Sequence, residues 1–249
     1  MEDIKDIIGK RICGRIKPIT TELANILGKG FKFIIAGNSL NKDIPNDFDL
    51  YADKGCEFNF NNIKKQVSEV LSETANALTV KINDTVVQFC KYKKDSLQEL
   101  VDSFDFAHIQ IGASFEIKEY IESTDCYIDL QEVYISDNWE QAKLLETTFY
   151  TRPEVESSFP MSSMIRAFKY KERGNFGDGS YIAAVFAILN QFLNRGFANY
   201  KDFKDQLAAV DLAMLDEFEG NVAWELYQTC VDKGLVKDPD THEDLDLDF

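Results

Sequence analysis

The amino-acid sequence predicts an α+β fold, a mixed sheet with helices, followed by a helical region. Three patterns support this prediction. Apolar runs and alternating patterns typical of strands recur between residues 31 and 135. Apolar residues at helical spacing precede these runs and separate them. After residue 148 the strand signals fade and helical spacing dominates. We therefore predict a first domain over residues 1–148, a helical domain over residues 149–237 and an acidic, disordered tail over residues 238–249.

The composition predicts a globular protein of the cytoplasm. Hydrophobic residues make up 45% of the chain, and no run approaches the roughly 20 apolar residues of a membrane helix. The first residues are acidic and lack the apolar core of a signal peptide. The five cysteines are scattered without metal-ligand spacing, as expected of reduced thiols. Only two histidines are present, which argues against a His-based zinc site or a Ser-His-Asp hydrolase.

The formal net charge of −16 limits the choice of partners. Such a charge opposes broad electrostatic binding to nucleic acid, so we expect no extended nucleic-acid track. The tail adds to the negative charge without any lysine or arginine. A small basic pocket for a phosphate-bearing molecule is therefore more compatible with this chain than a long basic groove.

The first elements predicted are two helices and a strand. Helices are expected over residues 2–15 and 20–28, with Thr20 or Thr21 as the cap of the second. The apolar run that follows ends at Gly37, as a buried strand entering a tight turn would. The turn Gly37-Asn38-Ser39 then offers backbone N–H groups and a hydroxyl, which suit a phosphate chain.

A second strand, Asp47–Tyr51, contains two aspartates in alternation. Asp47 and Asp49 fall on one face, and Phe48 and Leu50 fall on the other. Adjacent carboxylates repel each other unless a cation binds between them, so the pair predicts a Mg²⁺ site. The alternative is that both aspartates lie on the solvated face of an edge strand.

Together, the strand, the small-residue turn and the Asp-x-Asp strand resemble the signature of the DNA polymerase β-type nucleotidyltransferase superfamily. The resemblance implies a nucleotidyltransferase-type mixed sheet, in which Gly37, Asn38 and Ser39 contact the nucleotide and Asp47 and Asp49 hold metal ions. The family has a Gly-Gly or Gly-Ser turn, so Asn38 is a departure. The stretch from the turn to the aspartates is also short.

Several elements are expected between this strand and residue 103. Apolar residues at positions 63, 67, 70 and 71 predict a helix. Two alternating runs joined by Asn83-Asp84 predict a hairpin over residues 78–90. Residues 95–101 predict one or two helical turns with a capping residue.

Residues 104–115 predict a further strand that contains Asp105. A carboxylate between aromatic residues is poorly placed for a purely structural role, although a salt bridge or a strand edge would accommodate it. By order and type it matches the third carboxylate of the superfamily, which implies a role as metal ligand and general base. His108 is expected to point to the opposite face and to be structural. A second hairpin is predicted over residues 116–135.

A basic helix is the main cationic feature of the chain, over Met161–Gly174 with Ser162 or Ser163 as its cap. Arg166, Lys169 and Arg173 share one face and could bind a triphosphate; the alternative is a solvated helix face. The segment resembles phage-encoded nucleotidyltransferase-like proteins, in which Phe-Asp-Phe precedes a Tyr-Pro-x-Ser-Ser-x-x-Arg-type segment. Together, the two resemblances span residues 31–175. The phage-type resemblance would place the protein in the cytoplasm of a host cell.

Helices are also predicted over residues 180–194, 200–209 and 211–232. The apolar residues of the first of these are assigned to packing: Ile182, Val185, Phe186, Leu189, Phe192 and Leu193.

The functional prediction is a Mg²⁺-dependent nucleotidyltransferase that moves a nucleoside monophosphate from an NTP such as ATP to an acceptor hydroxyl. The resemblance implies two Mg²⁺ ions, for which Mn²⁺ can substitute. The acceptor is an RNA 3′ end, a protein hydroxyl or a small molecule. One alternative is a catalytically silent relative that binds nucleotide or a partner. Another is an acidic inhibitor whose tail mimics nucleic acid.

Overall fold

The computed structural model describes residues 4–40, 47–74, 76–119, 126–152, 159–208 and 221–239. The chain divides into two compact units, Met1–Glu146 and Thr147–Phe249. The first unit holds a mixed sheet with helices and the second is helical, so the predicted α+β class is confirmed. No helix of the described residues has both the length and the apolar character needed to cross a membrane.

The first unit is built on a seven-stranded sheet with the order β3-β4-β5-β2-β1-β6-β7. Strand β2 pairs with β5 in parallel, and the other pairs are antiparallel. The strands are β1 (Lys32–Ala36), β2 (Asp47–Ala52), β3 (Glu69–Glu73), β4 (Ala77–Ile82), β5 (Thr85–Cys90), β6 (Ile111–Glu119) and β7 (Cys126–Ile135).

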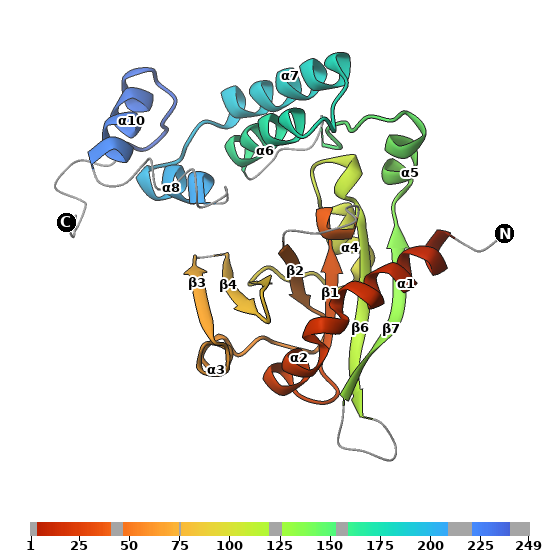
Figure 1. Cartoon of the computed structure of the whole chain (residues 1–249). Coiled ribbons are helices and arrows are strands. Elements are labelled where there is room, and N and C mark those ends of the chain that lie inside the picture. Colours follow the sequence, from red (N-terminus) through yellow and green to blue (C-terminus); the bar gives the residue numbers. More distant parts are fainter. Residues whose placement is uncertain are drawn as a thin grey trace. The chain divides into compact units, whose positions relative to one another are not determined.

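One face of this sheet carries the main core. Helices α1 (Ile4–Ile16) and α2 (Thr20–Leu27) cross that face (Figure 1), and α3 (Phe60–Gln66) adds Ile63 to the same cluster. Every second residue of the central strands points into this cluster, as the period of a half-buried strand requires. The buried strand residues include Phe33, Ile35, Phe48, Leu50, Val87, Phe89, Ala113 and Phe115.

The opposite face of the sheet is covered in part by α4 (Leu97–Asp102), which packs on Ile34 and Ala36 of β1. A Cβ atom at Gly112 of β6 would lie 2.7 Å from both Leu97 Cδ1 and Val101 Cγ2. A side chain there would displace the helix, so glycine permits this close packing. The same face contains Asp47 and Asp49, because side chains on a strand alternate.

Two of the local predictions after β2 have opposite outcomes. The hairpin is confirmed: Asn83 and Asp84 have φ values of 46° and 64°, which is the left-handed geometry of a tight hairpin turn. The helix over residues 63–71 is wrong beyond Gln66, because the chain turns into β3 at Glu69. Val70 and Leu71 are exposed on this edge strand. The pairing of β3 with β4 outweighs the helical spacing of a short apolar set.

Predicted helix caps were wrong at two helices. Ile19, and not a threonine, stands at the N-cap of α2, and Thr20 Oγ1 instead donates to the Ile16 carbonyl at 3.2 Å. Phe159 precedes α6 (Pro160–Glu172), whose first residue is Pro160, a favoured first residue of helices. Ser162 and Ser163 are buried inside that helix, where they pack instead of capping.

Other predicted elements of the first unit are confirmed. Ser96 caps α4 through the Glu99 amide at 3.1 Å, and β6 and β7 form the second hairpin, whose predicted turn lies outside the described residues. A further helix, α5 (Asp137–Leu144), follows β7, and Ser136 caps it by accepting from the Trp139 amide at 3.1 Å.

The second unit contains α6, α7 (Asp178–Arg195), α8 (Tyr200–Ala208) and α10 (Asn221–Asp232). Gly174, with φ of 74°, follows the C-terminus of α6 as predicted. An aromatic cluster packs α7, α8 and α10 together; its buried members are Phe192, Phe197, Tyr200, Phe203 and Tyr227. Residues 209–220 and 240–249, which include part of a predicted helix and most of the predicted tail, lie outside the described residues.

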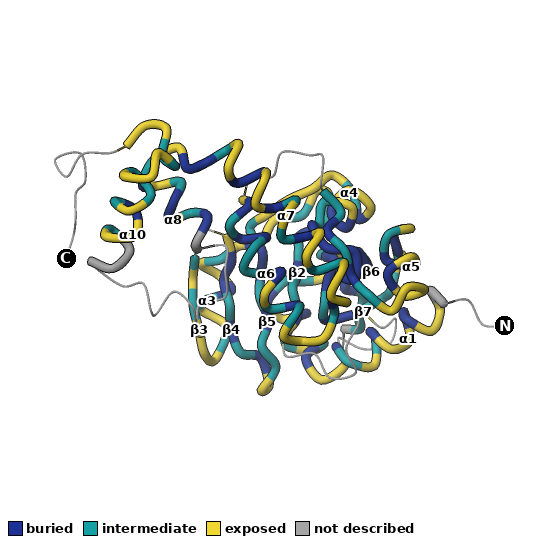
Figure 2. The backbone as a smooth tube through the Cα atoms, turned by 90° about the horizontal axis from the view of Figure 1, so that it is seen from above, coloured by how far each residue is buried: buried dark blue, intermediate teal, exposed yellow. Residues whose placement is uncertain are grey.

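The predicted packing face of α7 is largely wrong. Of the residues assigned to it, Phe192 is buried, but Ile182, Phe186, Leu189 and Leu193 are exposed. Figure 2 shows exposed and buried segments alternating along this helix. The face that packs instead contains Ala184, Ile188 and Gln191, together with Phe192.

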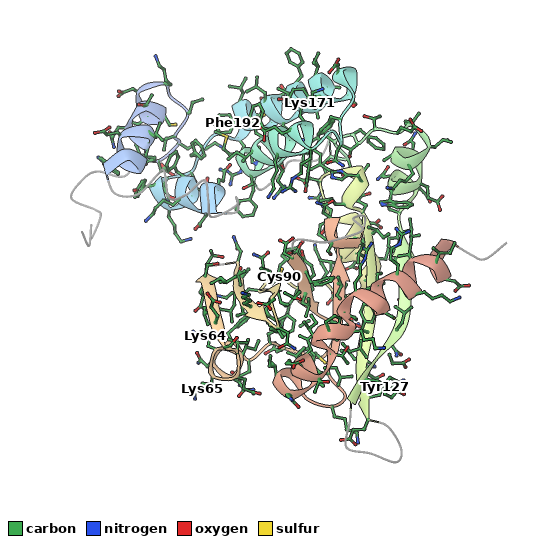
Figure 3. All side chains as sticks on the ribbon, viewed as in Figure 1. Lys64, Lys65, Cys90, Tyr127, Lys171 and Phe192 are labelled. Carbon is green, nitrogen blue, oxygen red and sulfur yellow. The ribbon has the colours of Figure 1, made fainter. Side chains whose placement is uncertain are left out.

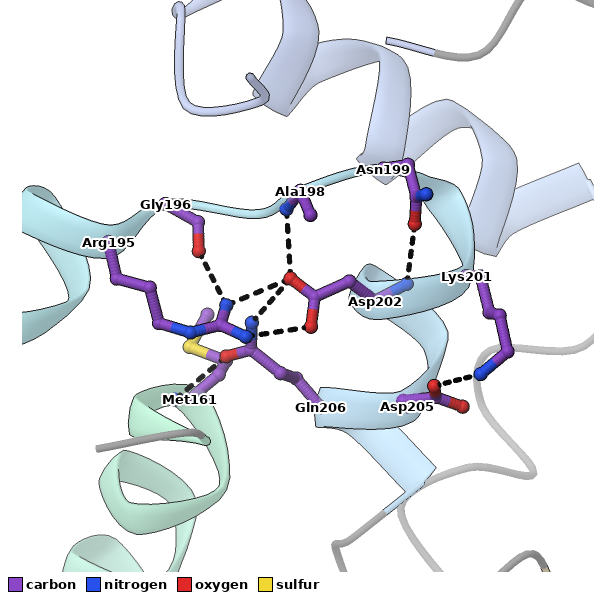
Figure 4. Close-up of polar contacts among 9 residues, drawn as sticks. All are labelled: Met161, Arg195, Gly196, Ala198, Asn199, Lys201, Asp202, Asp205 and Gln206. Carbon is purple, nitrogen blue, oxygen red and sulfur yellow. Dashed lines mark hydrogen bonds and ion pairs between the residues drawn. The ribbon is translucent and has the colours of Figure 1, made fainter. Parts of the chain in front are cut away.

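An ion pair links α7 to α8 in this unit (Figure 4). Arg195 donates to both carboxylate oxygens of Asp202, at 2.8 and 2.9 Å, and the Ala198 amide also donates to Asp202 at 2.8 Å. Gln206 donates to Asp202 at 3.3 Å and accepts from the Met161 amide at 3.4 Å. Partial burial raises the pKa of Asp202, but these hydrogen bonds and the Arg195 charge outweigh it and lower the pKa.

We expect Asp202→Asn to weaken the second unit in a pH-dependent way. A lowered folded-state pKa means that the carboxylate stabilises the fold above its ordinary pKa of about 4, and that this is lost as pH falls through the folded value. Loss of the pair should cost about 2 kcal/mol at neutral pH and flatten the acid-unfolding profile, followed by circular dichroism. Asp205→Asn is the control, because the Lys201–Asp205 pair is more exposed and should change stability by less than about 0.5 kcal/mol.

Candidate functional site

A tight turn follows β1 and is pinned to the neighbouring strand. Gly37 has φ of 89°, a conformation that side-chain-bearing residues rarely adopt. Its amide donates to the Ile111 carbonyl of β6 at 2.9 Å, and its carbonyl accepts from the Leu40 amide at 3.2 Å. The single 3₁₀ turn Asn38–Leu40 completes the bend. The predicted glycine turn therefore exists, and backbone hydrogen bonds fix its shape.

Ser39 is buried within this turn. Its carbonyl accepts a hydrogen bond from Arg15 of α1 at 3.2 Å, so a cation holds the turn from the side of that helix. The Ser39 hydroxyl is buried and has no hydrogen-bond partner among the described residues. A buried hydroxyl without a partner is costly to a folded protein. The hydroxyl is therefore a candidate contact for a ligand.

The two aspartates of β2 lie as the alternation predicts. Phe48 and Leu50 are buried in the main core, whereas Asp47 is exposed and Asp49 is half-buried on the opposite face. A Cβ atom on Gly37 would lie 3.9 Å from Asp49 Oδ2. The glycine turn and the Asp49 carboxylate are thus in near contact, although nine residues separate Gly37 from the start of β2 in the sequence.

Strand pairing identifies the neighbours of the aspartates, which sequence reasoning missed. Asp49 pairs with Gln88 of β5, and Gln88 donates to Thr79 of β4 at 3.1 Å. These side chains therefore share one row of one face. The hairpin alternation already gave the faces of β4 and β5, but nothing in the sequence showed that β5 would pair in parallel with β2.

Cys90 of β5, labelled in Figure 3, lies on the same face and pairs with Tyr51. Its burial, and then the negative charges of Asp49 and Asp47, raise the pKa of its thiol well above the ordinary value, although a hydrogen bond with Tyr51 opposes the shift. The two aspartates thus add to the effect of burial on this thiol. The thiol stays protonated and unreactive at neutral pH.

Asp105 is buried, but it does not lie in a strand. The chain forms a bend at Asp105, then the 3₁₀ turn Ala107–Ile109, and β6 begins only at Ile111. The predicted strand over residues 104–115 is therefore wrong in its first half, and so is the placement of His108 on an opposite strand face. His108 is buried within the 3₁₀ turn.

The bend at Asp105 lies close to the face that carries the aspartates. The ring centroids of Phe104 and Tyr51 are 6.3 Å apart, and Tyr51 lies two residues after Asp49 on the same face of β2. Phe104, the residue before Asp105, therefore packs on Tyr51, which lies next to Asp49 on this face.

Gln110 holds this bend in position. It is buried, and its Nε2 donates to the Phe104 carbonyl at 2.7 Å. Its Oε1 accepts from Ser136 Oγ and from Asn138 Nδ2, each at 2.9 Å. The Ser136 amide also donates to the Gln110 carbonyl at 3.2 Å. Gln110 thus ties the segment before β6 to the start of α5, a role that the sequence did not reveal.

The residues that could hold a metal ion are the aspartates of β2. Within the described ranges, no group of three His, Cys, Asp or Glu side chains is placed to bind a metal together. Asp47 and Asp49 supply the carboxylate oxygens that Mg²⁺ prefers, on one face and beside a glycine turn. The donor set therefore fits a hard cation that completes its coordination with water and phosphate oxygens.

The predicted basic residues belong to the second unit. Arg166 and Lys169 are half-buried on α6, and Arg166 donates to Ser163 Oγ at 3.4 Å. Arg173 is exposed at the C-terminal cap of the same helix. The three basic residues thus belong to a different unit from the aspartates, and their binding of a triphosphate stays a prediction.

We expect Gly37→Ala to weaken nucleotide binding about 10-fold. A side chain at φ of 89° strains the turn and places a methyl group beside Asp49. Gly55→Ala is the matched control, since Gly55 has φ of 83° and a Cβ there would meet no atom within 4 Å. The measurement is titration of both variants with an NTP. Because both substitutions strain a glycine with positive φ, equal NTP affinities of the two variants would contradict a role for the Gly37 turn.

The comparisons with known proteins give structural neighbours only. No protein-family model matches the sequence, and no curated protein matches it significantly. Its fold is similar to the Thermotoga maritima CCA-adding enzyme complexed with tRNA, at 10% identity and a TM-score of 0.45, over 89% of this chain and 52% of that one. A tRNA-processing enzyme with CTP gives 17% identity and a TM-score of 0.46, over 86% and 57% of the two chains.

This chain thus spans little more than half the length of those structures. The likeness is too distant to assign a reaction. The case for a function depends on the geometry around Gly37, Asp47 and Asp49.

Proposed function

We propose that this protein is a Mg²⁺-dependent nucleotidyltransferase, which transfers a nucleoside monophosphate from an NTP to an acceptor hydroxyl. The observation that supports this most directly is the approach of the Gly37 turn to the Asp49 carboxylate, with Asp47 on the same face. A turn that can receive phosphate oxygens, next to carboxylates that can hold Mg²⁺, is the arrangement that an NTP–Mg²⁺ complex requires.

Asp47 and Asp49 are proposed to hold Mg²⁺. When bound, the ion offsets the charge of the triphosphate, including the charge that develops on the departing pyrophosphate, and Mn²⁺ can take its place. The Ser39 hydroxyl is proposed to donate to a phosphate oxygen, which would satisfy a buried group that has no partner among the described residues. Arg15 keeps this turn in place through the Ser39 carbonyl.

Asp105 is proposed to accept the proton of the acceptor hydroxyl, and a role as further metal ligand stays a prediction. The hydroxyl oxygen forms a new bond to the α-phosphorus, and the bond between the α-phosphorus and the bridging oxygen breaks. Pyrophosphate leaves with that electron pair, and the proton goes to the Asp105 carboxylate. Gln110 and the packing of Phe104 on Tyr51 hold this carboxylate near the face that carries Asp49.

Arg166, Lys169 and Arg173 are proposed as additional triphosphate contacts. Guanidinium and ammonium groups stabilise charge on the departing pyrophosphate. We expect Arg166→Met to weaken NTP binding without changing the metal requirement. The acceptor is proposed to be an RNA 3′ end, a protein hydroxyl or a small molecule.

A labelling assay tests this function. The protein is incubated with each NTP labelled at the α-phosphate, with Mg²⁺ or with EDTA, and with acceptors from the three classes. The proposal expects label in one acceptor class together with released pyrophosphate, only when Mg²⁺ is present. Nucleotide binding without any transfer would instead favour a catalytically silent relative. The sequence feature that favours this alternative is Asn38, which stands where the superfamily has the second residue of a Gly-Gly or Gly-Ser turn.

A further inference from the structure

Helix α7 exposes a continuous apolar stripe. Its members are Ile182, Phe186, Leu189 and Leu193, which are 54%, 68%, 39% and 60% exposed. Their spacing of four, three and four residues places them on one face of the helix. We call this set the α7 stripe, and Figure 2 shows exposed segments recurring along the helix.

The α7 stripe is a second apolar face, in addition to the one that packs within the unit. Ile188 and Phe192 are buried on the packed side, where α7 meets its neighbours. A helix that is apolar on two sides normally buries both of them. Phe168 of α6 is also half exposed, and its ring centroid lies 6.3 Å from that of Tyr181 of α7.

We propose that the α7 stripe is an interface between two copies of this chain, which pair α7 against α7 in antiparallel orientation. The spacing of the stripe is the same in both directions. A two-fold axis between Phe186 and Leu189 therefore places Ile182 against Leu193 of the second copy, and Phe186 against Leu189 of the second copy. Such self-complementary pairing is what a symmetric dimer requires.

The charge distribution favours a second copy at this face. The chain has a formal charge of −16, so most of its surface repels another copy. Between Asp178 and Arg195, however, α7 has no charged residue. Antiparallel pairing also sets the acidic N-terminal end of one helix, at Asp178, near the C-terminal end of the other, at Arg195. The two helix dipoles are then opposed, which is favourable.

The size of the stripe predicts a weak dimer. From Ile182 to Leu193 the helix rises about 16 Å. A contact along this one short stripe buries less surface than the roughly 1,200–2,000 Å² of a standard interface. We expect a dissociation constant on the order of 10 μM. The dimer should therefore form and dissociate within the concentration range of ordinary solution measurements.

Sedimentation equilibrium of the full chain from about 1 to 100 μM tests the interface. The proposal expects a reversible monomer–dimer equilibrium, and Phe186→Glu should raise the dissociation constant at least 10-fold. Leu144→Glu is the matched control, because Leu144 is 84% exposed on α5, outside the stripe, and it should leave the equilibrium unchanged. Circular dichroism of each variant checks that it is folded.

A mixing experiment tests the antiparallel orientation. Ile182→Glu and Leu193→Lys should each weaken self-association, because each places a charge against an apolar residue of the second copy. Mixing the two proteins should restore dimers, since Glu at position 182 then meets Lys at position 193. A wild-type chain that stays monomeric throughout the range would overturn the proposal and point to a different occupant of the stripe. Failure of the mixture to recover would overturn the antiparallel pairing.

Discussion

Replacing either Asp47 or Asp49 by asparagine is expected to lower the rate of nucleotidyl transfer by about 10³-fold or more. Both carboxylates lie on the face of β2 that meets the Gly37 turn, and removing one charge weakens the hold on Mg²⁺. The fold should survive, because Asp47 is exposed and Asp49 is half-buried, while Phe48 and Leu50 provide the packing. The measurement is transfer of labelled nucleotide under saturating Mg²⁺.

Asp53→Asn serves as the control for this experiment. Asp53 lies just beyond the end of β2, and its carboxylate accepts from the Lys54 amide at 2.7 Å instead of facing the turn. It should retain wild-type transfer. If Asp47→Asn and Asp49→Asn also retained wild-type rates, the assignment of these aspartates as metal ligands would be wrong.

The second large effect is expected for Gln110→Leu, which should destabilise the first unit by about 3 kcal/mol. Leucine matches the size of the side chain but leaves the Phe104 carbonyl without its donor, and Ser136 and Asn138 without their acceptor. For a unit of this size the melting temperature should fall by roughly 6–12 °C. Differential scanning calorimetry measures the change.

Gln131→Leu is the matched substitution, because Gln131 is exposed on β7 and its side chain donates to Asp129 of the same strand. It should change the melting temperature by less than about 2 °C. A small effect at Gln110 as well would mean that the bend at Asp105 does not depend on this side chain.

The sequence predicted those parts of the fold in which local pattern and tertiary packing agree. The alternation of β2 correctly separated Asp49 from Phe48, and Asn83-Asp84 correctly indicated a hairpin turn. The turn at Gly37 could be predicted because an apolar strand ended at a residue that tolerates positive φ.

Other features depend on contacts that no local pattern encodes. Val70 and Leu71 continue the helical spacing that begins at Ile63, yet pairing with β4 makes them part of an edge strand. Helix α7 is a second example. Helical spacing identified an apolar face of this helix, but it did not show that the rest of the chain covers a different face.

The candidate site was predicted in part. Their spacing correctly predicted that Asp47 and Asp49 share one face of a strand, whereas their metal binding stays a prediction. Their neighbours Gln88 and Cys90 follow from the parallel pairing of β2 with β5, which joins segments far apart in the chain. The role of Gln110 likewise depends on Ser136, 26 residues away. Residues that support a site through tertiary hydrogen bonds have no signature of their own in a single sequence.

Isothermal titration of each NTP in the presence of Mg²⁺, with the wild type and the Asp47→Asn/Asp49→Asn double variant, is the decisive test of the nucleotide site. The wild type is expected to bind at least one NTP, EDTA to abolish the binding, and the double variant to have lost it while remaining folded. Equal, metal-independent binding by both proteins, or no binding by the wild type, would contradict the assignment of the Gly37 turn and the β2 aspartates as a nucleotide site.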